Sequence, residues 1–75
     1  MLNVKRIDHI AILVEDLDEA ISFWRDTLGV DLTFVEDLPE EHAKVAFLPV
    51  GESEVELIKP TTEDSGLAKY LARYF

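Results

Sequence analysis

The chain contains no cysteine, and this absence removes thiol chemistry from consideration. Without a thiol there can be no disulfide, no thiolate nucleophile and no thiolate-bound zinc. Any bound metal must therefore be held by histidine, carboxylate groups and water.

Basic residues are also scarce, since seven Lys and Arg stand against 16 Asp and Glu. The formal net charge of −9 would repel phosphate backbones and anionic lipid surfaces. We therefore expect no nucleic-acid partner and no membrane partner.

Long hydrophobic runs are missing as well. No apolar run approaches the roughly 20 residues that span a bilayer, and the N-terminus lacks the basic-then-apolar order of a signal peptide. These absences predict a cytoplasmic protein.

What the chain does contain is enough apolar sequence for a folded unit. Of its 75 residues 48% are hydrophobic, which is too many for a disordered chain. A chain of this size buries only about 60% of the surface that its unfolded form exposes. Because disulfides cannot compensate, we expect extra stability from association with a second copy.

The residue pattern predicts an α+β fold in one domain over residues 1–75, with the order βαβββ followed by a closing helix. Asp16 and Glu19 have the spacing of a capping box, and Gly29 stands where a left-handed helix end is expected. The predicted elements are a strand over 4–14, a helix from the Asp16 cap to Gly29, strands over 30–36, 43–49 and 54–59, and a helix lined by Leu67, Ala68, Leu71 and Phe75.

Side-chain alternation places potential metal ligands on one face of the predicted sheet. In the last strand Val55 and Leu57 form the face that can pack under the first helix, so Glu54 and Glu56 point the other way. In the first strand the helix-facing positions leave His9 on that opposite face. The sequence thus predicts His9, Glu54 and Glu56 on the face away from the helix.

These residues resemble a known family. The likeness rests on Ile7-Asp8-His9-Ile10-Ala11-Ile12, the helix that Asp16 begins, Leu38-Pro39-Glu40-Glu41 with Val45-Ala46-Phe47-Leu48, and Val55-Glu56-Leu57-Ile58-Lys59-Pro60. Together they are similar to the vicinal oxygen chelate superfamily, which includes glyoxalases and bleomycin-resistance proteins. Within it the likeness is nearest to the N-terminal half of the methylmalonyl-CoA epimerases, and next to glyoxalase I.

The resemblance implies that this chain is one βαβββ module, half of a two-module cupped sheet around a divalent metal. It implies that His9 and Glu56 are metal ligands and that Glu56, with Glu54, carries protons during catalysis. The implied reaction is proton transfer next to the carbonyl of an acyl-CoA thioester. Two positions depart from the epimerase pattern: His42 replaces a usual glycine, and Val45 stands where some epimerases have a carboxylate.

A half-module leaves an apolar face and an unpaired strand edge, both of which favour pairing with another module. A two-fold homodimer would reproduce the family's pseudo-symmetry and bring both copies of His9 and Glu56 around one point, and two such pairs could form a tetramer. Nitrogen and oxygen ligands of this kind suit cobalt, zinc, nickel, manganese or iron.

Whether the chain is an enzyme is left open by the sequence. Alternatives to an epimerase-like activity are a glyoxalase-I-like lyase, a metal-free module that binds small molecules, and a catalytically inactive half-domain that is designed or truncated.

Overall fold

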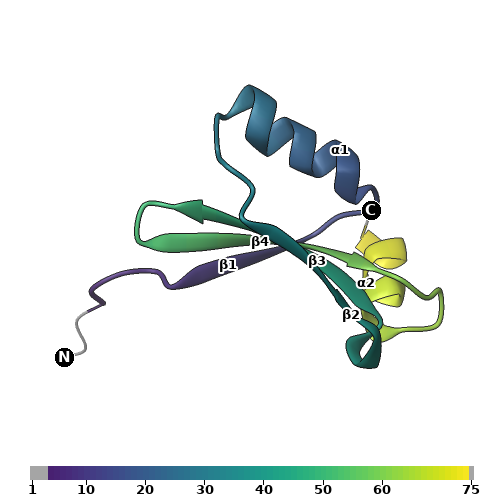
Figure 1. Ribbon diagram of the computed structural model, residues 1–75. Helices are drawn as coiled ribbons and strands as arrows, with labels where there is room; N and C mark the ends of the chain where they lie inside the picture. Colours follow the sequence, from purple (N-terminus) through teal and green to yellow (C-terminus); the bar gives the residue numbers. More distant parts are fainter. Residues whose placement is uncertain (1–3, 75) are drawn as a thin grey trace.

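The computed structural model describes residues 4–74 and contains the predicted order of elements, with one mixed sheet and two helices (Figure 1). A π-helical segment at Phe23–Thr27 continues the first helix, and a 3-10 turn at Pro39–Glu41 joins the second strand to the third. Phe75, predicted to line the closing helix, lies outside the described residues. The elements are β1 (His9–Leu13), α1 (Leu17–Ser22), β2 (Phe34–Leu38), β3 (Ala43–Val50), β4 (Ser53–Pro60) and α2 (Gly66–Tyr74).

The strand order in the sheet is β1-β4-β3-β2. β1 runs parallel to β4, whereas β3 pairs antiparallel with both β4 and β2. The predicted hairpin between β3 and β4 is present, and Gly51 takes a positive φ of 60° in its turn. This order makes the first and last strands neighbours, so residues far apart in sequence meet in the sheet.

The ends of the first helix follow the predicted capping residues. The Asp16 side chain accepts a hydrogen bond of 2.9 Å from the backbone N–H of Glu19, which satisfies one free donor of the first turn. At the other end Gly29 adopts a φ of 73°, the left-handed conformation that glycine tolerates best. Leu28 N–H donates to the carbonyl of Phe23, the five-residue spacing of a π-helical turn.

The main core lies between α1 and one face of the sheet. Leu48 and Leu57 are fully buried there, and Trp24 packs partly buried against the same cluster. The side chains that alternate with this face point away from α1, and we call the surface they form the open face. The buried core residues that pack together are Leu17, Ile21, Ala46, Leu48, Val55 and Leu57.

Two strands are placed differently from the prediction. The first strand, predicted over 4–14, pairs only over His9–Leu13, because its sheet neighbour β4 begins at Ser53. The second, predicted over 30–36, is shifted to Phe34–Leu38. Val30 and Leu32 instead pack against the core under α1, so their apolar side chains are partly buried without strand pairing.

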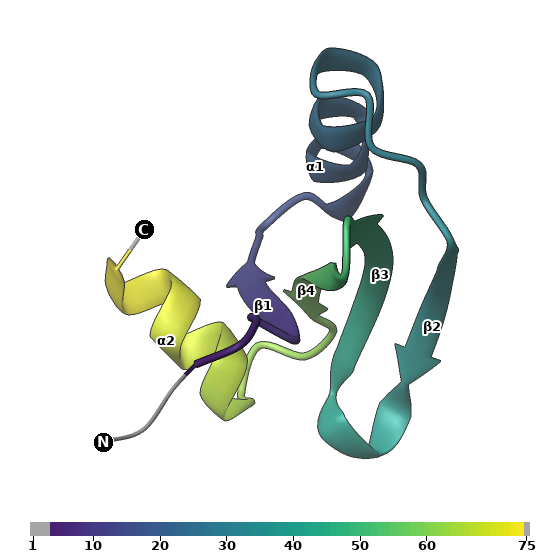
Figure 2. The same cartoon turned by 90° about the vertical axis from the view of Figure 1, so that its left-hand side faces the viewer.

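α2 lies beside β1 at the edge of the sheet (Figure 2). Ser65 caps this helix by accepting a hydrogen bond of 3.1 Å from the N–H of Ala68, and Leu71 is buried. No helix formed by residues 4–74 has the length and apolar character needed to cross a membrane.

Candidate metal centre

The predicted ligands lie together on the open face. β1 places Ala11 beside Glu56 of β4, and His9 beside Glu54. Parallel partners in register project to the same side of a sheet, so all three polar side chains share this face. The predicted juxtaposition of His9 with Glu54 and Glu56 is therefore present in the structure.

His9 and Glu56 approach each other across the two strands. Nε2 of His9 is 3.8 Å from Oε2 of Glu56. Two ligands bound at about 2.1 Å to one metal would be roughly 3.0 to 3.4 Å apart, depending on the coordination geometry. The observed separation is thus only slightly longer than that of two ligands on one ion.

The two ligand candidates differ in exposure. The side chain of His9 is 54% exposed, whereas that of Glu56 is 22% exposed. Glu56 lies beside the apolar Phe47, its register partner on β3. Packing therefore restrains the carboxylate much more than it restrains the imidazole.

Asp8 is a residue of the site that the sequence pattern did not assign. Its carboxylate accepts a hydrogen bond of 3.1 Å from Nδ1 of His9, and Arg6 lies 3.4 Å from its other oxygen. This hydrogen bond, with the attraction of Glu56, raises the pKa of His9. The same hydrogen bond, with the charge of Arg6, lowers the pKa of Asp8. In the sequence, only the position of Asp8 directly before His9 pointed to a role in the site.

An aromatic pair borders the site. Phe34 of β2 stacks on Phe47 of β3 with ring centroids 4.5 Å apart. Since Phe47 is the register partner of Glu56, the stack forms an apolar wall next to the carboxylate. Val45, on the same face, is only 3% exposed, and its register partner on β2 is the exposed Glu36.

The donor set of one copy is incomplete for a metal site. Within residues 4–74 no group of three or more His, Asp or Glu side chains is arranged to hold an ion. His9 and Glu56 are chemically suitable ligands, but they are two where a closed site needs four or more. They fit a metal as one half of its protein ligand set.

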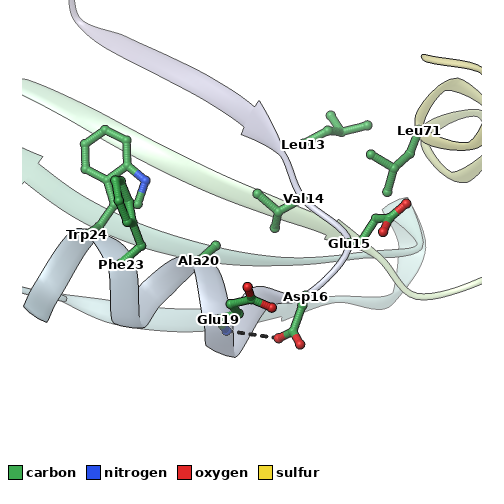
Figure 3. Close-up of a pocket in the computed structure, with 9 residues that line it drawn as sticks. All are labelled: Leu13, Val14, Glu15, Asp16, Glu19, Ala20, Phe23, Trp24 and Leu71. Carbon is green, nitrogen blue, oxygen red and sulfur yellow. Dashed lines mark hydrogen bonds between the residues drawn. The ribbon is translucent and has the colours of Figure 1, made fainter. Parts of the chain in front are cut away.

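A groove on the surface lies elsewhere, between α1, the end of β1 and α2 (Figure 3). Phe23 and Trp24 stand at one side of it, and Leu71 and Glu15 stand at the other. It contains no histidine, and Asp16 within it is used to cap the helix. The metal-ligand candidates therefore belong to the open face and not to this groove.

Comparison with known proteins identifies the family. Residues 6–73 match the model of the glyoxalase/bleomycin resistance protein/dioxygenase superfamily. The chain belongs to this superfamily. The predicted family membership and the predicted half-module fold are thus both confirmed.

Several relatives in this superfamily are epimerases. The mitochondrial methylmalonyl-CoA epimerase of Mus musculus is 38% identical over 68 residues, which are 91% of this chain and 38% of that protein. The human enzyme is 35% identical over 95% of this chain and 40% of its own length. The chain thus spans about two fifths of the length of these relatives.

Solved structures agree with the sequence comparison. A hypothetical protein from Bacillus halodurans superimposes with a TM-score of 0.87 at 38% identity, covering 92% of this chain and 50% of that chain. A variant of the Streptomyces coelicolor methylmalonyl-CoA epimerase in complex with 2-nitronate-propionyl-CoA gives 0.86 at 36% identity, over 96% and 54%. This chain accordingly corresponds to one half of each fold.

Proposed function

We propose that this chain is a half-module of a divalent-metal-dependent epimerase acting on an acyl-CoA thioester, with its site formed between two copies. The observation that carries the proposal is the approach of His9 and Glu56 to 3.8 Å on the open face. The similarity to methylmalonyl-CoA epimerases supports the choice of substrate class. A cytoplasmic location stays a prediction.

The chemistry expected of such a site is removal and return of the proton next to the thioester carbonyl. A divalent metal, when bound, would act as a Lewis acid that stabilises the enolate oxygen. His9 and Glu56 would hold it, and Glu54 and Glu56 are the carboxylates available to carry the proton. The stacked Phe34 and Phe47 would exclude water from one side of the reacting carbon.

A second copy would supply the missing ligands. If two copies paired about a two-fold axis at this site, a second His9 and a second Glu56 would reach the same ion. The ion would then have two imidazoles and two carboxylates as ligands. Cobalt, zinc, nickel, manganese and iron all accept such a set. Two dimers could associate further into a tetramer.

Metal binding and assembly are tested together by measuring the solution mass with and without chelator, alongside elemental analysis of the purified protein. We expect a metal-containing dimer with one ion per two chains. His9→Ala and Glu56→Gln should each lose the metal, while His42→Ala and Glu40→Gln, which alter exposed residues off the open face, should retain it. A metal-free monomer that is unaffected by added Co²⁺ or Zn²⁺ would contradict the proposal.

Turnover is tested separately by exchange of the α-proton of methylmalonyl-CoA with deuterated solvent. Exchange above the buffer rate, dependent on Co²⁺ and lost in His9→Ala, would support the epimerase activity. Binding of the thioester that survives both chelation and His9→Ala would instead indicate a metal-free binding module. A folded, metal-loaded dimer without exchange would indicate an inactive half-domain or a different substrate, such as that of a glyoxalase-I-like lyase.

A further inference from the structure

The exposed His9 ring has one defined partner on its Nδ1 side. Its side chain is half exposed, so packing alone does not fix the orientation of the imidazole. Nδ1 lies 3.1 Å from Oδ2 of Asp8, and Nε2 faces Glu56. The two ring nitrogens therefore have different neighbours, with the metal-ligand candidate Glu56 on one side only.

Asp8 is itself held in place by the strand that carries Glu56. The backbone carbonyl of Asp8 accepts a hydrogen bond of 3.0 Å from the N–H of Glu54. One residue earlier, the carbonyl of Ile7 accepts a hydrogen bond from the Ser53 hydroxyl. These bonds attach the backbone before His9 to the start of β4, the strand that carries Glu56.

The carboxylate of Asp8 is also restrained at its second oxygen. Arg6 approaches Oδ1 to 3.4 Å, and another nitrogen of the same guanidinium lies 3.4 Å from the carbonyl of Glu52 in the β3–β4 turn. Arg6 thus lies beside Oδ1 of Asp8, and Oδ2 faces His9. An ionised carboxylate can only accept hydrogen bonds, so the imidazole nitrogen that faces it must carry the proton.

We propose that Asp8 is a positioning residue that fixes His9 as the Nδ1–H tautomer and directs the lone pair of Nε2 toward the position beside Glu56. This inference rests on the proposed function, because it assigns a role to Asp8 in the same metal site. A carboxylate on the far nitrogen of a ligating histidine orients the ring and raises its basicity, and removing such a partner typically weakens metal affinity about 10- to 100-fold.

The experiment compares Co²⁺ affinity, measured by calorimetry, in the wild-type chain, Asp8→Ala and Asp8→Asn. We expect Asp8→Ala to bind Co²⁺ about 10- to 100-fold more weakly. Asp8→Asn, which keeps a neutral acceptor oxygen, should lose less. Asp31→Ala, which removes an exposed carboxylate from a loop, is the matched control and should bind like the wild type.

A second readout separates this role from a purely structural one. In the metal-free protein, at a pH above the folded pKa of His9 where the ring is neutral, ¹⁵N correlation spectra of the His9 ring report which nitrogen is protonated. The wild type should show Nδ1–H, and Asp8→Ala should shift toward Nε2–H with an unchanged circular dichroism spectrum.

The outcomes are distinguishable. If the wild type binds Co²⁺ and Asp8→Ala matches it in both affinity and tautomer, the role of Asp8 is overturned while the proposed function stands. If the wild type binds no metal, the proposed function fails, and the tautomer measurement still decides whether Asp8 fixes His9. An Nε2–H tautomer in the wild type would overturn the inference directly.

Discussion

At the scale of single residues, the site depends on an imidazole placed between two carboxylates. Asp8 contacts one nitrogen of His9 and Glu56 lies near the other. Both interactions favour the protonated ring, which is why the pKa of His9 is raised. Strand alternation in the sequence predicted that His9 and Glu56 lie on the same face of the sheet. It could not predict the contact between Asp8 and His9. Adjacent residues of a strand normally point to opposite faces, but Asp8 stands just before β1 begins, where strand pairing does not impose this alternation.

A pH dependence of the metal-free protein follows from this residue. Because folding raises the pKa of His9 above its ordinary value of about 6.5, the protonated ring stabilises the folded state. That contribution is complete below the unfolded pKa and is lost as pH rises through the folded pKa. We expect a melting temperature that declines slightly across this interval, measured in chelator.

The effect should be small because the ring is exposed and solvent screens the interaction. His9→Gln should remove this part of the decline, whereas Asp31→Ala should keep it. An NMR titration midpoint of His9 at or below its ordinary value would contradict the assignment.

At the scale of elements, the turn between β2 and β3 contains the one non-glycine residue with a positive φ among residues 4–74. His42 has a φ of 54° and a ψ of 43°, the left-handed region in which a side chain is disfavoured. The resemblance had marked this position as one where epimerases usually have glycine. The sequence thus identified an unusual residue, and the backbone conformation supplies the reason that glycine is preferred there.

His42→Gly should stabilise the protein. A left-handed conformation costs an L-residue roughly 1 to 2 kcal/mol, and glycine loses about 0.5 to 1 kcal/mol of this gain through its greater freedom in the unfolded chain. We therefore expect a net gain of up to about 1.5 kcal/mol. Each 1 kcal/mol raises the melting temperature of a domain of this size by about 4 to 8 °C.

The measurement is thermal unfolding followed by circular dichroism. His42→Ala is the control, since it removes the imidazole but keeps the Cβ, and it should bring no gain. Equal melting temperatures for the two variants would show that φ strain at this position is negligible.

At the scale of the whole molecule, the acidic charge and the incomplete ligand set act against each other. The chain carries a net charge of −9, so two copies repel each other. The open face nevertheless presents two ligand candidates and an aromatic pair that a second copy could cover. Association should therefore depend strongly on the ions in solution.

We expect added salt to strengthen the proposed dimer in the presence of chelator, because screening reduces the repulsion between like-charged chains. Co²⁺ should strengthen it more, since an ion bound only by the dimer shifts the equilibrium by mass action. Sedimentation equilibrium at low and high sodium chloride, with and without Co²⁺, measures both effects. A dimer that weakens with salt would indicate an interface held by ion pairs, and His9→Ala should keep the salt response while losing the response to Co²⁺.

The sequence by itself determined the order of elements, the helix boundaries at Asp16 and Gly29, the β3–β4 hairpin and the face that carries His9 and Glu56. These features depend on local periodicity and on capping residues, which are readable along the chain. Only the tertiary structure decided that β1 pairs with β4, which brings His9 within 3.8 Å of Glu56. It also shortened β1 and shifted β2, because strand limits depend on where the neighbouring strand begins and ends. The contact between Asp8 and His9 belongs to the same class, since it follows from hydrogen bonds that β4 makes to the chain ahead of β1.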